Sequence, residues 1–116
     1  MMTIRHQAGW FTTKEQALAE AAGDGMHAFV SEDDAYELGP HWHAFSAHLY
    51  LLDGGLHMTD CATGQEFDCR AGGKVIIPAR CLHKEKTIGM TYVLALTVDP
   101  ATLRGEINRA PAELHG

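Results

Sequence analysis

Short apolar segments separated by turn residues fill the second half of the chain, and this spacing restricts what the chain can fold into. Residues 49–52 and 75–77 are apolar runs, and a longer apolar segment covers residues 92–98. Glycine-rich turns are expected at residues 53–55 and 63–64, because such pairs interrupt strands. Strands with turn signals about every 8 to 12 residues are typical of a β-sandwich or β-barrel. We therefore predict an all-β fold.

One short helix is expected near each end of the chain. The segment Thr13-Lys-Glu-Gln16 has the form of a capping box, and the glycines of residues 23–25 end the helix that it begins. Asp99 as a cap, followed by Pro100, predicts a second short helix that extends to about Asn108. Between them, residues 26–30 are expected as a strand, residues 31–34 as an acidic loop, and Gly39-Pro40 as a turn.

Composition narrows the class of protein. The 116 residues are expected to form a single domain, 1–116, because they are 46% hydrophobic and carry a net charge of only −6. The nine basic residues are scattered without a basic stripe, so no nucleic-acid partner is expected. No apolar run is long enough for a membrane span, and no signal peptide is evident, so we expect no membrane partner and a cytoplasmic location.

The three cysteines are not arranged as a disulfide framework or a zinc ribbon. Cys61, Cys69 and Cys81 give an odd count and contain no C-x-x-C pair. Cys81 shares strand parity with His83 and is expected to be a buried thiol, with a redox or ligand role as the alternative.

Four histidines predict a metal centre inside a small barrel. His41, His43 and His48 lie in one segment, and His83 follows the apolar run 75–77. On an extended strand, the H-x-H step points two imidazoles to the same face. Neutral imidazoles that converge in this way are suited to a divalent metal ion. The other four histidines share no pattern and are expected at the surface: His6, His27, His57 and His115.

Two motifs in the middle of the chain resemble those of the cupin superfamily. The family's first motif is G-x5-H-x-H-x4-E-x6-G, and its spacing is kept by His41, His43, position 48 and Gly55. The second motif is G-x5-P-x-G-x2-H-x3-N, and it is matched by Gly72, Pro78 and His83. The flanking strands extend the resemblance over most of the chain. The resemblance implies a double-stranded β-helix, or jelly roll, with a metal ion held inside the barrel mouth.

The chain departs from these motifs at four positions. Ala35 and His48 replace the leading glycine and the glutamate of the first motif, and Arg80 and Thr87 replace the glycine and asparagine of the second. The glycine that Arg80 replaces serves a turn that favours positive φ. In cupins a bend after the H-x-H step brings the next ligand round, so the resemblance implies that His48 completes a four-histidine site. Strict alternation along the strand instead points His48 to the opposite face.

Two residues are candidates for acid–base chemistry. Glu85 shares strand parity with His83, which would place it in the pocket as a general base or as a hydrogen-bond partner of a ligand. The alternative is a solvated Lys-Glu-Lys edge. Tyr50 is the second candidate, and it is also a candidate for the pocket wall, together with Phe45, Met58, Met90 and Tyr92.

The resemblance leaves the reaction open. It implies one divalent transition metal ion (Fe, Ni, Zn, Mn or Cu) and an activity among the dioxygenases, isomerases, lyases and decarboxylases of the superfamily. We expect a metal-dependent, dioxygenase-like enzyme that acts on a small organic molecule. The alternative is a non-catalytic cupin that binds or senses a small molecule or a metal. A homodimer is expected, with the N-terminal segment that contains Trp10 and Phe11 as an arm at the contact.

Overall fold

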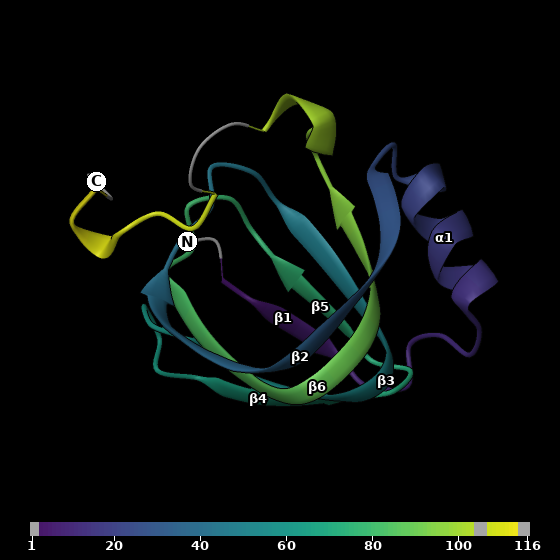
Figure 1. The fold of residues 1–116 in the computed structure, drawn as a ribbon, viewed down its shortest axis with the longest axis horizontal. Helices are drawn as coiled ribbons and strands as arrows, with labels where there is room; N and C mark the ends of the chain where they lie inside the picture. The colour runs from purple at the N-terminus through teal and green to yellow at the C-terminus, as the bar shows by residue number, and fades with distance from the viewer. Residues whose placement is uncertain (1–2, 104–106, 114–116) are drawn as a thin grey trace.

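The computed structural model describes residues 3–103 and 107–113. Its elements, in chain order, are β1 (Arg5–Gln7), α1 (Lys14–Gly23), β2 (His27–His41), β3 (Ala47–Asp60), β4 (Glu66–Arg70), β5 (Lys74–Ile77), β6 (His83–Leu96) and two short 3-10 turns, η1 (Pro100–Thr102) and η2 (Pro111–Glu113). The strands pair antiparallel in the order β1-β5-β3-β6-β2, with β4 added to β3. The sheet curls into a barrel, and α1 lies outside it (Figure 1). The predicted all-β jelly roll is confirmed.

Strand β3 continues through the segment where the sequence predicts a tight turn. The register between β3 and β6 shifts twice, near residues 51–53 and 54–56. Gly54 has φ of +87°, and a Cβ atom there would lie 2.0 Å from the carbonyl oxygen of Gly89. Glycine therefore allows the two strands to approach while β3 bends, and the prediction of a turn at residues 53–55 is wrong. The turn predicted at residues 63–64 is present, because the Gly64 N–H donates to the Asp60 carbonyl oxygen at 2.7 Å.

Strand β2 also continues through two segments where the sequence predicts a loop and a turn. The acidic segment 31–34 and the Gly39-Pro40 step both lie within β2, which pairs with β6 from His27↔Leu96 to His41↔His83. Strand β2 is the last strand in the sheet order. Charged residues and proline are common on edge strands because one side of the strand needs no partner.

The two ends of the chain differ in how well their helices were predicted. Thr13 caps α1, and the capping box with Gln16 is present, as predicted. At the other end, Asp99 accepts a hydrogen bond from the Ala101 N–H at 2.9 Å, but only the 3-10 turn η1 follows. Leu103 has an extended backbone, with φ −73° and ψ 135°, so the predicted C-terminal helix is reduced to this turn. Residues 104–106 of that prediction lie outside the described residues.

Buried side chains form separate layers on the two faces of β3. Leu49 and Leu51 belong to the core inside the barrel, which also contains Val75 and Met90. Tyr50, on the opposite face of β3, packs with the helix residues Ala17 and Ala21. Alternation along β3 thus decides which side chains can reach the interior. None of the helices in the described part of the chain has the length and apolar character of a membrane span.

Candidate metal centre

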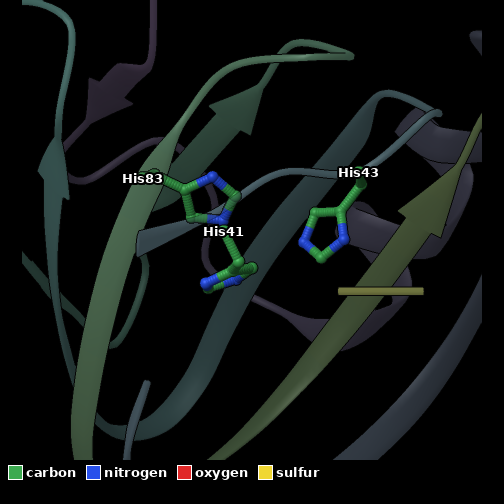
Figure 2. A group of neighbouring side chains, drawn as sticks. All are labelled: His41, His43 and His83. Carbon is green, nitrogen blue, oxygen red and sulfur yellow. The ribbon is translucent and has the colours of Figure 1, made fainter. Parts of the chain in front are cut away.

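The structure brings together three of the four predicted histidine ligands. His41 lies at the end of β2, His43 lies two residues beyond it, and His83 begins β6. One nitrogen from each ring lies within 4.8 Å of the corresponding nitrogens of the other two. The ring centres of His41 and His83 are 4.3 Å apart, and that of His43 is 5.1 and 5.2 Å from them. Figure 2 shows the three imidazoles gathered in one space.

Backbone carbonyl groups hold the same nitrogen of all three rings. The Nδ1 atom of His41 lies 2.8 Å from the Gly39 carbonyl oxygen, and that of His83 lies 2.8 Å from the Cys81 carbonyl oxygen. The Nδ1 atom of His43 lies 2.9 Å from the carbonyl oxygen of Ile107. In neutral imidazoles this arrangement places the proton on Nδ1, which donates to the carbonyl and leaves the lone pair of Nε2 free. Metal-binding histidines are commonly oriented by such a bond.

The free nitrogens of His41 and His83 face a carboxylate. Both Nε2 atoms are buried and have no hydrogen-bond partner among the described residues. They nevertheless lie 3.3 and 3.5 Å from Oε1 of Glu85, without the alignment of a hydrogen bond. Two lone pairs and a carboxylate oxygen directed at one point repel one another unless a proton or a metal cation lies between them. This donor set therefore fits a metal ion.

The surroundings shift the pKa values of His41 and His43 in opposite directions. Burial opposes the charged form of His41, but Glu85 and the Gly39 carbonyl outweigh it and raise the pKa of this imidazole. Burial lowers the pKa of His43, and the nearby His83 and His41 lower it further. Glu85 thus stabilises the charged form of His41, whereas the surroundings of His43 stabilise its neutral form.

Glu85 is a partly buried carboxylate, and one of its oxygens accepts a hydrogen bond from a phenol. The Tyr36 hydroxyl donates to Oε2 at 2.5 Å, and Oε1 is the oxygen that faces the histidines. Burial opposes ionisation of Glu85, but the contacts with His41, His83 and Tyr36 dominate and hold the pKa of this carboxyl well below its usual range. Burial and the Glu85 charge raise the pKa of Tyr36. The predicted place of Glu85 at the site is thus found, and the solvated-edge alternative is not.

A cavity of about 500 Å³ inside the barrel adjoins the histidines. Its lining includes His43 and Glu85, with an aliphatic and aromatic wall made by residues such as Phe45, Leu49 and Met90. A second hollow, of about 570 Å³, is lined by His57 and Arg70 among others and contains none of the three histidines. We assign the site to the first cavity because the buried nitrogens without partners converge beside it.

His48 and Tyr50 lie away from this group. Both occupy the face of β3 that is turned toward α1, because the strand alternates regularly from Ala47 to Leu51. The His48 Nδ1 atom is 4.0 Å from a carboxylate oxygen of Asp24, and the Tyr50 hydroxyl donates to Glu20 at 2.6 Å. The bend that was expected to bring His48 round therefore does not do so, and neither residue is part of the site as we define it.

The loop before His83 takes the shape that the motif glycine predicts, although an arginine occupies it. Arg80 has φ of +64°, and its N–H donates to the His43 carbonyl oxygen at 2.8 Å. Its guanidinium lies over the Trp42 ring, 5.1 Å from the ring centre. The buried Cys81 supplies the carbonyl that orients His83, and burial raises the pKa of its thiol to about 11. Cys61, Cys69 and Cys81 are all free thiols.

Two contributors to the site were missed from the sequence. Tyr36 reaches Glu85 because β2 and β6 pair Leu38 with Glu85, a register that spacing along the chain does not give. Ile107 contributes a backbone carbonyl from a segment that also pairs Arg109 with Trp42. Of the histidines predicted at the surface, His27 is exposed, and His57 is partly exposed and contacts Asp68 and Glu66 at 2.7 and 2.9 Å. His6 is only partly exposed and its Nε2 atom is buried, and His115 lies outside the described residues.

No family model matches the chain, and no curated protein matches it. Among solved structures, it is similar to a DUF861-family protein of unknown function from Pseudomonas syringae, with 16% identity and a TM-score of 0.58 over 62% of this chain and 31% of that one. A DUF861-family protein from Thermotoga maritima has 14% identity and a TM-score of 0.55 over 83% of this chain and 99% of that one. A TDP-quinovose 3,4-ketoisomerase from Campylobacter jejuni has 12% identity and a TM-score of 0.58 over 76% of this chain and 72% of that one.

The chain spans less than a third of the Pseudomonas protein and nearly the whole of the Thermotoga protein. At these identities the likeness concerns the fold, which is the cupin jelly roll.

Proposed function

We propose that this chain, which has the cupin fold, is a metal-dependent enzyme that binds one divalent transition metal ion through His41, His43 and His83. Glu85 is the fourth ligand in this proposal. The observation that carries it is the shared orientation of the rings: each Nδ1 atom is held by a backbone carbonyl, so each Nε2 atom is free to bind an ion.

The ligand set is suited to several metals. Imidazole nitrogen favours Fe, Ni, Cu and Zn, and the carboxylate of Glu85 extends the range toward Mn. Held by His41, His43, His83 and Glu85, such an ion would supply Lewis-acid or redox chemistry to an organic molecule in the cavity. The residues of the chain orient the ligands, keep bulk water from the buried nitrogens of His41 and His83, and hold Glu85 through the hydrogen bond from the Tyr36 hydroxyl. A dioxygenase-like reaction on a small organic molecule is the activity that we propose.

The enzyme is favoured over a simple binding module by the ionisable groups at the site. Glu85 and Tyr36 form a hydrogen-bonded pair beside the histidines, so a group that can exchange a proton is within reach of a molecule in the cavity. The mostly apolar wall of the same cavity favours the second candidate, a cupin that binds a small molecule without reaction.

Oxygen consumption separates the two candidates. Metal-free protein would be loaded with Fe(II) under anaerobic conditions and then mixed with aerated buffer and each member of a panel of small organic molecules. Substrate-dependent oxygen uptake that is absent in His83→Ala would support the enzyme. Saturable binding of a panel member without uptake or product would support the binding module.

A further inference from the structure

The cavity beside the histidines combines an apolar wall with a smaller set of polar groups. Phe45, Leu49, Met90 and Leu94 belong to the apolar part of its lining. The polar residues of the lining are Asp33, the exposed Asp34, Glu85, Tyr36, Tyr92, His43 and Asn108. A cavity of about 500 Å³ with few polar groups is of the size that holds a small organic molecule.

Each phenol directs its proton to a carboxylate. The Tyr36 hydroxyl donates to Glu85, and the Tyr92 hydroxyl donates to Oδ2 of Asp33 at 2.7 Å. A phenol has a single proton, so both tyrosine oxygens can only accept a further hydrogen bond. The second oxygen of Asp33 also remains an acceptor. The polar part of the cavity therefore offers mainly acceptors to a bound molecule.

In the metal-free protein, the formal charges of the cavity lining are negative. The described lining residues include Asp33, Asp34 and Glu85 and neither a lysine nor an arginine, and His43 and Asn108 complete the polar set with the two tyrosines. Without a metal ion, an anionic molecule in this space would meet the partly shielded charges of Asp33 and Glu85. A cation would meet carboxylates that are already oriented by the tyrosines, and its hydrogen-bond donors would match the acceptors of the wall.

We propose that the cavity binds a small aliphatic amine, or another small organic cation with an apolar part, and that Asp33 holds its charged group. The apolar part lies against the aliphatic and aromatic wall. This inference adds the class of bound molecule to the function proposed above. It rests on that function only in placing a metal ion next to the bound molecule. Asp33 is a specificity-determining residue in this account, because Glu85 is occupied by the histidines and by Tyr36.

The test compares three probes of nearly equal size. The ¹⁵N-labelled protein would be titrated with n-butylammonium, n-butanol and butyrate at fixed pH 7 and fixed ionic strength, followed by amide chemical shifts. Both metal-free and zinc-loaded protein would be used, with the zinc content measured separately. In the metal-free protein, we expect butylammonium to bind about tenfold more tightly than butyrate, the difference that one charged hydrogen bond produces, with butanol between them. The zinc-loaded protein shows how far the charge of the ion offsets this preference.

Two charge-removing variants on β2 make the test specific. Asp33→Asn should abolish the preference for butylammonium over butyrate. Glu32→Gln removes the same charge from the neighbouring exposed position, which does not line the cavity, and should keep the preference. If Asp33→Asn does not fold, the order of the three probes on the wild-type protein decides the question.

Equal or tighter binding of butyrate to the metal-free protein would overturn the proposal, and so would equal binding of butanol and butylammonium to that form. A preference that persists unchanged in Asp33→Asn would overturn the role of that residue. If the proposed metal site does not exist, the protein will contain no zinc after loading. The titration of the metal-free protein would still test whether the cavity prefers butylammonium.

Discussion

Oε1 of Glu85 lies 3.3 Å from Nε2 of His41 and 3.5 Å from Nε2 of His83. The first cupin motif has a glutamate at the position that His48 occupies here, and His48 is turned toward α1. A carboxylate nevertheless reaches the histidines, from β6, two residues after His83. The site thus keeps three imidazoles and one carboxylate, and we infer that Glu85 takes the place of the motif glutamate.

Replacing Glu85 should weaken metal binding. Glu85→Gln keeps the size of the side chain and removes the negative charge that faces the two Nε2 atoms. We expect the affinity for Zn²⁺ to fall by at least about tenfold, as measured by competition with a chromophoric chelator. Glu37→Gln, at an exposed position on β2, is the matched control and should leave the affinity unchanged. Unchanged affinity in Glu85→Gln would limit Glu85 to proton transfer.

The carboxylate of Glu20 should make stability depend on pH. It accepts hydrogen bonds from Trp10, Tyr50 and the buried Lys74. Burial raises the pKa of Glu20, but these contacts outweigh burial and lower it from 4.5 to about 2. The contribution is therefore fully present above pH 4.5 and is lost as the pH falls toward 2.

Urea unfolding of the wild type and of Glu20→Gln at several pH values measures this contribution. We expect the variant to be less stable at pH 7 by about 1 kcal/mol, since the pair is partly exposed to solvent. The difference should shrink between pH 4.5 and pH 2. A difference that stays constant over this range would contradict an ionic role for Glu20.

Gly54 should be intolerant of a side chain. Gly54→Ala places a Cβ atom against the Gly89 carbonyl oxygen at a residue whose φ is +87°. We expect a loss of about 2 to 4 kcal/mol in the free energy of unfolding, from strain and steric overlap together. Gly39→Ala is the control, because its Cβ would have nothing within 4 Å. Equal stability of the two variants would mean that β3 and β6 do not approach as closely as described.

The homodimer stays a prediction. Trp10 is 47% exposed, but its indole N–H donates to Glu20 of the same chain, so the predicted arm is held against its own helix. Phe29 and Val30 on β2 are also exposed and offer apolar surface for a contact. Light scattering at micromolar concentration should give twice the mass of the 12.7 kDa chain. A monomer would remove the prediction.

The parts of the site that follow from local spacing could be predicted from the sequence. The H-x-H step and the position of His83 after an apolar strand were enough to identify three residues that the structure brings together. The capping box at Thr13 is equally local. For His48, strand alternation gave the observed orientation, and the family pattern gave another.

The remaining features depend on how distant strands pair. Gly54 looks like a turn residue in sequence, but it serves a close approach to Gly89 within a continuing strand. Tyr36 and Glu85 meet through the register of β2 against β6, and Ile107 orients His43 from 64 residues away. No periodicity within one segment encodes such contacts.

Elemental analysis of untagged protein, beside His83→Ala, tests the central claim most directly. His83 is fully buried at the centre of the group, and circular dichroism would show that the variant is folded. We predict about one equivalent of a transition metal in the wild type after reconstitution, nearly none in His83→Ala, and full retention in the control His27→Ala, which changes an exposed histidine. A folded wild-type protein that takes up no Fe(II), Ni(II) or Zn(II), or a His83→Ala variant that keeps its metal, would contradict the account.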